Sequence, residues 1–389
     1  MLKNSGILFI ILFLAVNVNV FSQTQSIPVS SINGSTSVII PTAVPFLTVD
    51  PESRAGGMGD AGVATSPDAN SMHWNPAKYA FIQNDAGLSI SYSPWLTNLG
   101  IHDINLAYIA GYYRVAKDQV IGGSFRYFSY GSINFTDQND NLLRTSNPNE
   151  FAFDLTYSRL FSDNISGAVA FRYINSNLAS GTLVDNVAVN AGQAFAADVA
   201  VYYNKDIRLG DRKGKLNFGL NISNMGTKMD YTANPQTKDY LPANLKLGGA
   251  LTVNLDDYNS LTLTADINKL LVPTPAKSGT EPNVSVLSGM IESFYDAPNG
   301  FHEELQEINY SIGGEYWYRK QFAIRSGYFH ESQIMGNQQY YTFGLGLKLN
   351  VISFDFSYLV TASASNPLAN TMRFTISLDF DAFRKLRNS

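Results

Sequence analysis

The sequence contains no cysteine, so backbone hydrogen bonds and side-chain packing must hold the fold without a disulfide framework. Charged residues are also scarce: they make up 15% of the 389 residues, against about 25% in an ordinary soluble domain. The formal net charge is only -5, and no block of like charges occurs along the chain. A disulfide scaffold and a nucleic-acid-binding function are therefore excluded.

Long apolar runs are missing as well, except at the extreme N-terminus, which excludes a bundle of membrane-spanning helices. Residues Met1–Ser22 have the pattern of a signal peptide, with Lys3 before an apolar stretch and small residues near its end. The apolar stretch is shorter than the roughly 20 residues that a membrane anchor needs. We therefore expect export, with a mature chain that begins at Gln23.

Aromatic residues are plentiful, and from Ala86 onward apolar and polar residues alternate in short segments. The clearest segment lies near the C-terminus, where every second residue is apolar: Met372, Phe374, Ile376, Leu378 and Phe380. Because successive side chains of a strand point to opposite faces, one face of this segment suits lipid and the other suits water. A soluble β-sandwich alternates in the same way, so alternation alone does not identify the fold.

The alternation predicts an all-β fold, a 14-stranded antiparallel transmembrane β-barrel. The predicted strands are Ala86–Pro94, Asp103–Val115, Gln119–Tyr130, Glu150–Phe161, Ile165–Asn177, Gln193–Ile207, Lys215–Asn224, Ala243–Leu255, Asn259–Leu271, Gln306–Arg319, Gln321–Glu331, Gln338–Leu349, Val351–Thr361 and Thr371–Phe380. The segment Gln321–Glu331 has mixed parity, because Arg325 and Ser326 are adjacent polar residues.

The breaks between these strands alternate between short and long, which favours a barrel over a sandwich. The long breaks span Gly131–Asn149, Leu178–Gly192, Met225–Pro242 and Val272–Leu305. Bacterial outer-membrane barrels place short turns in the periplasm and long loops outside. We therefore expect a multi-pass protein of the cell outer membrane, with extracellular long loops and with both termini periplasmic or inside the barrel.

Four parts follow from this organisation: a signal peptide at 1–22, a plug-like segment at 23–85, the barrel at 86–380 and a periplasmic tail at 381–389. The plug-like segment contains Gly57, Gly59 and Gly62 at the spacing of a dinucleotide-binding motif. No strand precedes these glycines, and Pro67 follows them too closely for a helix. A nucleotide cofactor is therefore not expected.

The plug-like segment instead resembles the N-terminal plug of the FadL family of outer-membrane channels. The resemblance rests on a glycine-rich stretch and on an Asn-Pro-Ala sequence before the first strand, that is, on Gly57, Met58, Gly59, Asp60, Asn75, Pro76 and Ala77. Within that family, the stretch Ser53–Gly62 and residues 69–77 look most like the PorV group of barrel proteins of the type IX secretion system.

The resemblance to the PorV group implies a role in protein transport. It implies binding to the SprA-like translocon barrel and to the C-terminal signal domains of secreted cargo, with transfer of cargo to a PorU-like sortase. Membrane lipid and lipopolysaccharide are further expected contacts. A FadL-like channel for small hydrophobic molecules uses the same barrel and stays open as the alternative.

No residue set predicts catalysis or metal binding, so we expect neither an enzyme nor a metal or cofactor site. The four histidines lack metal-ligand spacing, and no G-x-S-x-G motif occurs. Proteins of the PorV group have been linked to lipid A deacylation, and a Ser/His pair assembled by the fold stays open at this point.

Two further features carry competing interpretations. Several charges fall on the predicted inner faces, where they would either line a permeation path or form pairs with one another and with the plug. They are Arg172, Lys246, Asp266, Lys348, Asp355, Arg373 and Asp379. The break Val272–Leu305 is unusually apolar, and it either binds a partner through Ile291, Phe294, Tyr295 and Phe301 or covers the barrel mouth.

Overall fold

The computed structural model describes residues 40–97, 100–136, 142–179, 183–184, 187–232, 238–275, 284–333, 335–361 and 370–381. The predicted signal peptide, residues 23–39 of the plug-like segment and residues 382–389 of the tail lie outside this part of the chain. None of the helices in the described part is long and apolar enough to span a bilayer.

Fourteen antiparallel strands close into one barrel, which confirms the predicted fold class. Their bounds are β1 Ala86–Pro94, β2 Ile104–Ala116, β3 Gln119–Tyr130, β6 Asn149–Leu160, β7 Ile165–Asn177, β10 Gly192–Leu209, β11 Arg212–Gly226, β12 Asn244–Asn254, β13 Asn259–Leu270, β14 Ile308–Tyr318, β15 Phe322–His330, β16 Gln339–Lys348, β17 Ile352–Thr361 and β18 Met372–Asp379. The barrel closes where β1 pairs with β18, with Ile90 opposite Ile376.

Side chains along each strand alternate between the outer and the inner face of the wall. In β18, Phe374 and Ile376 are exposed on the outside, while Arg373 and Thr375 are buried inside. The mixed parity of β15 follows the same rule, because Arg325 is buried in the lumen and the neighbouring Ser326 lies on the outer face. Apolar side chains thus cover the outer face, as a barrel in lipid requires.

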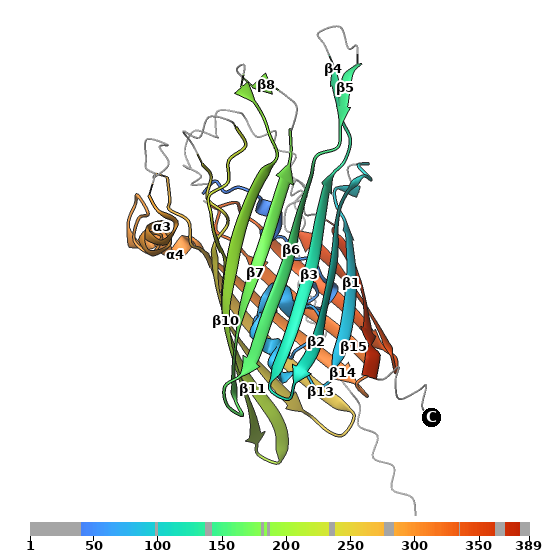
Figure 1. The fold of residues 1–389 in the computed structure, drawn as a ribbon. Helices are drawn as coiled ribbons and strands as arrows, with labels where there is room; N and C mark the ends of the chain where they lie inside the picture. The colour runs from blue at the N-terminus through green and yellow to red at the C-terminus, as the bar shows by residue number, and fades with distance from the viewer. Residues whose placement is uncertain are drawn as a thin grey trace, which may run out of the picture. The chain divides into compact units, whose positions relative to one another are not determined.

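The two ends of the barrel differ (Figure 1). At the end that we call the short-turn end, strands follow one another closely, as β10 and β11 do across Gly210 and Asp211. The opposite, long-loop end carries two small hairpins and two helices. These are β4 Ile133–Thr136 with β5 Leu142–Ser146, β8 Leu183–Val184 with β9 Val187–Ala188, α3 Val286–Glu292 and α4 Phe301–Gln306.

Residues 40–82, which we call the luminal segment, lie within the barrel (Figure 1). The segment contains four short helical turns: η2 Pro45–Thr48, α1 Ser53–Gly56, α2 Ser71–Trp74 and η3 Pro76–Phe81. Near its start, Phe46 and Leu47 pack in a buried cluster with Leu106, Phe128 and Ile174 of the wall. Further along, Met72 and Tyr79 pack in a second cluster with Tyr112 and Val120.

Polar side chains begin two of these turns. The Glu52 carboxylate accepts a hydrogen bond from the backbone N–H of Ala55 at 2.8 Å, which caps α1. The Asn75 side-chain oxygen accepts one from the N–H of Ala77 at 3.0 Å, and Pro76 occupies the first position of η3, where its fixed φ suits a helix start. The Asn-Pro-Ala sequence is therefore the start of a helical turn.

Candidate functional site

The glycine-rich stretch of the luminal segment lies directly against the inner wall. A Cβ atom added at Gly57 would come within 2.9 Å of the Gly344 Cα atom in β16, so the two backbones approach as only glycines allow. Gly59 has φ +68, and a Cβ atom there would meet the backbone of Tyr328 at 2.6 Å. Between them, Met58 is fully buried. The glycine spacing thus serves close packing on strands β15 and β16.

Asp60 attaches the luminal segment to strands β16 and β18. Its carboxylate accepts hydrogen bonds from the Arg373 guanidinium and from the Tyr340 hydroxyl. All three side chains are almost completely removed from solvent. Because a charge in such surroundings is stable only when it is paired, this contact fixes the position of the segment.

Arg54 makes a second buried ion-pair network. Its guanidinium lies 2.8 Å from Glu315 of β14 and 2.8 Å from Asp68 in the luminal segment. Glu315 also accepts a hydrogen bond at 2.7 Å from Arg325, which in turn lies 2.7 Å from Asp355 of β17. The network joins the luminal segment to three strands of the wall.

Further contacts join the luminal segment to strands β6, β7, β10 and β13. The Asp266 carboxylate of β13 accepts hydrogen bonds from the N–H groups of Gly62 and Val63 at 2.7 and 2.9 Å. The Asn75 amide donates to the Val201 carbonyl oxygen at 3.0 Å. The Ala77 carbonyl oxygen accepts bonds from the hydroxyls of Ser158 and Ser166. All seven residues of the predicted plug motif are buried, and the segment is bonded around the circumference of the lumen.

Most of the predicted inward charges have partners inside the barrel. Arg172 lies between Asp154 and Asp198, and Arg373 pairs with Asp60. Sequence reasoning missed the partners Asp154, Asp198 and Glu315. Their inward position follows from the same alternation. Asp154 and Asp198 lie on the two strands that flank β7, 18 and 26 residues from Arg172, whereas Glu315 contacts Arg54 across 261 residues. These contacts favour the interpretation of the interior as a network of pairs over that of a polar permeation path.

The predicted break Val272–Leu305 contains α3 and most of α4, which project to one side at the long-loop end (Figure 1). We call its exposed large apolar side chains the α3–α4 surface: Leu287, Ile291, Phe294, Tyr295, Phe301 and Leu305. Leu287, Ile291, Phe294 and Tyr295 follow at helical spacing, so they share one side of the helix and the turn after it. Phe301 is the most open of the six, at 76% exposed.

Buried polar contacts hold this loop to the barrel. The Lys269 ammonium of β13 lies 3.1 Å from Glu304 and 2.6 Å from Glu307. Glu304 also accepts a hydrogen bond from the N–H of Ala297 at 2.7 Å, and Thr274 donates one from its own N–H to Asp296 at 2.9 Å. The described part of the loop, residues 284–305, is therefore held to the barrel, although its apolar side chains face outward.

Asp296, Glu304 and Glu307 stand close enough to hold a metal ion. The Lys269 ammonium contacts two of these carboxylates and supplies the positive charge there. Burial raises the pKa of both Asp296 and Glu307 above the ordinary carboxyl value. The lysine ammonium therefore occupies the place that a cation would take between Glu304 and Glu307.

A hydrolytic Ser/His pair is not assembled among the described residues. His73 lies 3.0 Å from Asp50 through one ring nitrogen and contacts Arg126 through the other. His330 contacts the Tyr328 hydroxyl at 3.4 Å. In the part of the chain that the structure describes, no histidine is hydrogen-bonded to a serine hydroxyl. The histidines therefore give no support for a serine nucleophile with a histidine base.

The sequence matches a model of a known protein family. A family model described as "Type IX secretion system protein PorV" matches residues 33–277. No curated protein matches the sequence significantly.

Solved structures that align with the chain include the toluene transporter TbuX of Ralstonia pickettii, at 12% identity and a TM-score of 0.44, covering 84% of this chain and 96% of TbuX. A FadL homologue of Pseudomonas aeruginosa aligns at 11% identity and 0.42, covering 88% and 100%. The toluene transporter TodX of Pseudomonas putida aligns at 12% and 0.42, covering 83% and 95%. Such scores carry no information on function.

Proposed function

Because the chain belongs to the PorV family of type IX secretion system proteins, we propose that it binds the translocon barrel of that system and the C-terminal signal domains of cargo, and passes cargo to the sortase-like attachment protein. Family membership itself makes the chain a component of this secretion system, and its closed barrel fits an outer-membrane protein. The partners and the transfer of cargo are the proposed part.

The α3–α4 surface is the observation that carries the proposal. Six large apolar side chains are exposed on one loop, and exposed apolar side chains gathered on a loop commonly mark a protein-binding site. Three of them are aromatic, the residue class that is enriched at interface centres. Ile291, Phe294, Tyr295 and Phe301 are therefore the residues that we propose for partner binding.

The fixed conformation of the loop supports this role. The contacts of Lys269 with Glu304 and Glu307 order the loop in the absence of any partner. A preordered surface loses less conformational entropy on binding than a loop that must fold onto its partner. We infer that the loop presents a ready-made binding face rather than a lid.

A FadL-like channel for small hydrophobic molecules has less support. Passage through the lumen would require the luminal segment to leave its contacts with Arg373, Glu315 and Asp266. Two of these contacts are buried ion pairs. If one partner leaves such a pair, the other stays behind as an uncompensated buried charge, which is strongly unfavourable. We therefore propose that the segment acts as a plug that stays in place.

A crosslinking experiment tests the proposed contact. A photo-crosslinkable amino acid in place of Phe301 should link the protein to a very large barrel protein or to cargo in living cells, because this side chain faces outward from the α3–α4 surface. The same group in place of Phe354, which faces outward from the membrane wall, is the matched control. Equal protein crosslinks from both positions, or none from Phe301, would contradict the proposal.

We also propose that the long-loop end faces the outside of the cell and the short-turn end faces the periplasm. A protease site inserted between Asn299 and Gly300 should then be cut on intact cells, and one inserted between Gly210 and Asp211 should be cut only after lysis. All four residues are exposed, so burial does not decide the outcome. Cleavage at Asp211 on intact cells would show that the short-turn end faces the outside, which contradicts the proposed orientation.

A further inference from the structure

The outer wall of the barrel has a shallow groove that crosses strands β10 to β13, with a volume of about 470 Å³. We call it the wall groove. Its lining consists of three glycines and of apolar or aromatic side chains, with Tyr203 and Phe218 at one end and Ala265 and Ile267 at the other. The Tyr203 hydroxyl is the only polar side-chain group of this lining, so the groove suits a hydrocarbon ligand.

Two small residues make the wall groove deeper than the wall around it. Gly249 of β12 stands opposite Ala265 of β13, and both lie on the outer face. In the same row of the sheet, Phe218 of β11 stands opposite Gly249 and Ile312 of β14 stands opposite Ala265, and both are large and exposed. A hydrocarbon chain over the two small residues would therefore contact side chains on both flanks, which a flat wall does not offer.

The wall groove runs from the edge of the barrel wall toward its middle. Tyr203 stands opposite Ile165, the first residue of β7, so it lies at the edge of the wall at the short-turn end. Ala265, in contrast, lies in the middle of β13. Tyrosine is enriched at the interface between membrane and water, where its ring is in apolar surroundings and its hydroxyl is wet. The groove thus extends from headgroup depth into the hydrocarbon.

Lys205 places a positive charge at the outer end of the wall groove. It follows Tyr203 by two residues in β10, so the two side chains leave the same face of the strand. Its ammonium has no hydrogen bond or ion pair with any described residue, whereas Lys215, on the other face of the β10–β11 hairpin, lies 2.7 Å from Asp206. A lysine at this depth keeps its stem on apolar surface and its charge among the lipid headgroups.

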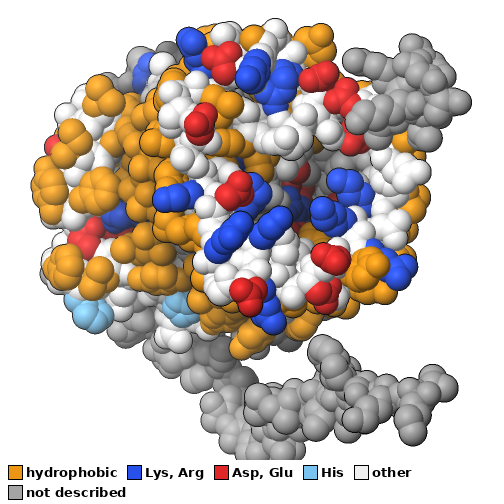
Figure 2. Space-filling model, turned by 90° about the horizontal axis from the view of Figure 1, so that it is seen from below, with side chains coloured by type: hydrophobic (Ala, Val, Ile, Leu, Met, Phe, Trp, Pro, Cys, Tyr) orange, Lys and Arg blue, Asp and Glu red, His pale blue; other side chains and the backbone are white. Residues whose placement is uncertain are grey.

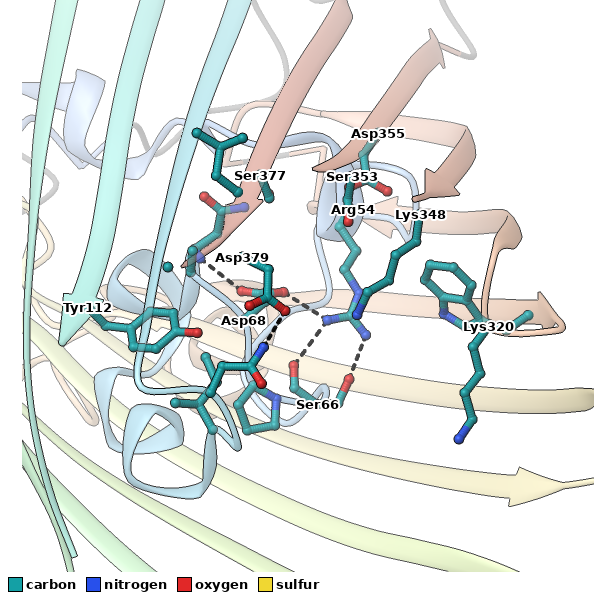
Figure 3. Close-up of a pocket in the computed structure, with 18 of the residues that line it drawn as sticks. Arg54, Ser66, Asp68, Tyr112, Lys320, Lys348, Ser353, Asp355, Ser377 and Asp379 are labelled. Carbon is teal, nitrogen blue, oxygen red and sulfur yellow. Dashed lines mark hydrogen bonds and ion pairs between the residues drawn. The ribbon is translucent and has the colours of Figure 1, made fainter. Parts of the chain in front are cut away.

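The arginines inside the barrel at the same end are in a different situation. Seen from this end, charged side chains gather around the middle, inside a ring of hydrophobic side chains (Figure 2). In the pocket there, the Arg54 guanidinium donates to the Asp68 carboxylate at 2.8 Å and to the Ser66 hydroxyl at 2.7 Å (Figure 3). These inner contacts join parts of the chain to one another, whereas Lys205 faces the bilayer.

We propose that the wall groove binds a phospholipid of the adjoining leaflet, with one acyl chain over Gly249 and Ala265 and the phosphate at the Lys205 ammonium. A phospholipid has its charge at one end and its apolar part at the other, which is the arrangement of Lys205 and the groove. The apolar face of another membrane protein would need no cation at the edge. The proposal goes beyond the function proposed above and is independent of the α3–α4 surface.

Native mass spectrometry of the full-length protein, released from detergent micelles, tests the role of the phosphate. The probes are phosphatidylglycerol and a diacylglycerol with the same two acyl chains, and the dissociation constant of the first bound lipid is measured. We expect phosphatidylglycerol to bind about fivefold more tightly, because one lysine near the membrane surface attracts the phosphate. Equal binding of the two lipids would overturn the assignment of Lys205 to the headgroup.

Two leucine variants locate the acyl chain. G249L should weaken binding of phosphatidylglycerol at least about tenfold, because its side chain takes the place of several methylene groups of the lipid. A Cβ atom at Gly249 would lie 3.5 Å from the Phe218 ring, an ordinary contact, so the barrel should still fold. The matched control is G314L, at an outward glycine of β14 outside the groove, where the Cβ atom would lie 3.6 Å from Leu263.

The control G314L should leave lipid binding unchanged, and heat-resistant migration on gels verifies that both variants are folded. Equal weakening in both would mean that lipid binds all around the wall, which contradicts a specific groove. If G249L binds lipid normally but loses another membrane protein on purification, the groove is an interface between proteins and the proposal is wrong.

A lysine variant tests the headgroup contact separately from the groove. K205Q should lose the preference for phosphatidylglycerol over diacylglycerol, since it removes the cation and leaves the acyl-chain contacts in place. K213Q removes an exposed lysine from the same hairpin, on the face opposite to Lys205, and should keep the preference. A preference that survives in K205Q, or that is lost equally in K213Q, would contradict binding of the phosphate at Lys205.

Discussion

Changing Phe294, Tyr295 and Phe301 together to serine is expected to abolish co-purification of the translocon barrel and of cargo domains. Buried aromatic anchors at interfaces commonly contribute more than about 2 kcal/mol each, so loss of three should reduce the affinity by several orders of magnitude. All three side chains are exposed in the free protein. The barrel should therefore assemble normally, which heat-resistant migration on gels would verify.

The matched control for this triple variant is I133S/L142S, which removes two exposed apolar side chains from the β4–β5 hairpin at the same end of the barrel. This control variant should still co-purify with the translocon barrel and the cargo domains in full. If the triple variant assembles and still retains every partner, the α3–α4 surface covers the barrel mouth without binding, and the other long loops become the candidates.

Replacing Asp60 by alanine is expected to destabilise the folded protein by about 3–5 kcal/mol, because it leaves the buried Arg373 guanidinium without its partner. The Tyr340 hydroxyl loses its acceptor in the same change. Equilibrium unfolding by urea in lipid vesicles would measure the difference from the unaltered protein.

Two further variants test whether the buried charge of Asp60 accounts for the loss of stability. D60N keeps a polar side chain at this left-handed position and should cost less than D60A. D206A breaks the Asp206–Lys215 pair, in which Asp206 is 83% exposed, and should cost no more than about 1 kcal/mol, since exposed pairs contribute little. Similar effects of D60A and D206A would show that the luminal segment is not held by its buried charges.

The strands could be predicted because lipid on one side and a filled lumen on the other impose a period of two on every one of them. The predicted bounds of β1, β3 and β7 agree with the structure to the residue, and the other strands differ by a few residues at their ends. In β15, the adjacent polar residues Arg325 and Ser326 interrupt the alternation of polar and apolar residues. Ser326 lies in the middle of β15 and faces outward although it is polar, so the alternation of polar and apolar residues does not show which of the two faces inward.

The luminal contacts could not be predicted because they join residues far apart in the chain. Arg54 and Glu315 are separated by 261 residues, and nothing in either local sequence specifies the other. The helix α3 did leave a signal: Ser285 caps it, and Leu287 and Ile291 have helical spacing. The proline, glycine and serine residues of the surrounding segment instead favour an irregular loop, which hides this signal.

Purification of the full-length protein from detergent-solubilised outer membranes tests the central claim most directly. A component of the secretion system that binds its translocon and cargo should bring down a very large barrel protein, together with exported proteins that share a C-terminal domain. A protein that elutes alone under conditions that preserve other membrane complexes, and that conducts small hydrophobic molecules in vesicles, would contradict the proposed function and favour the channel.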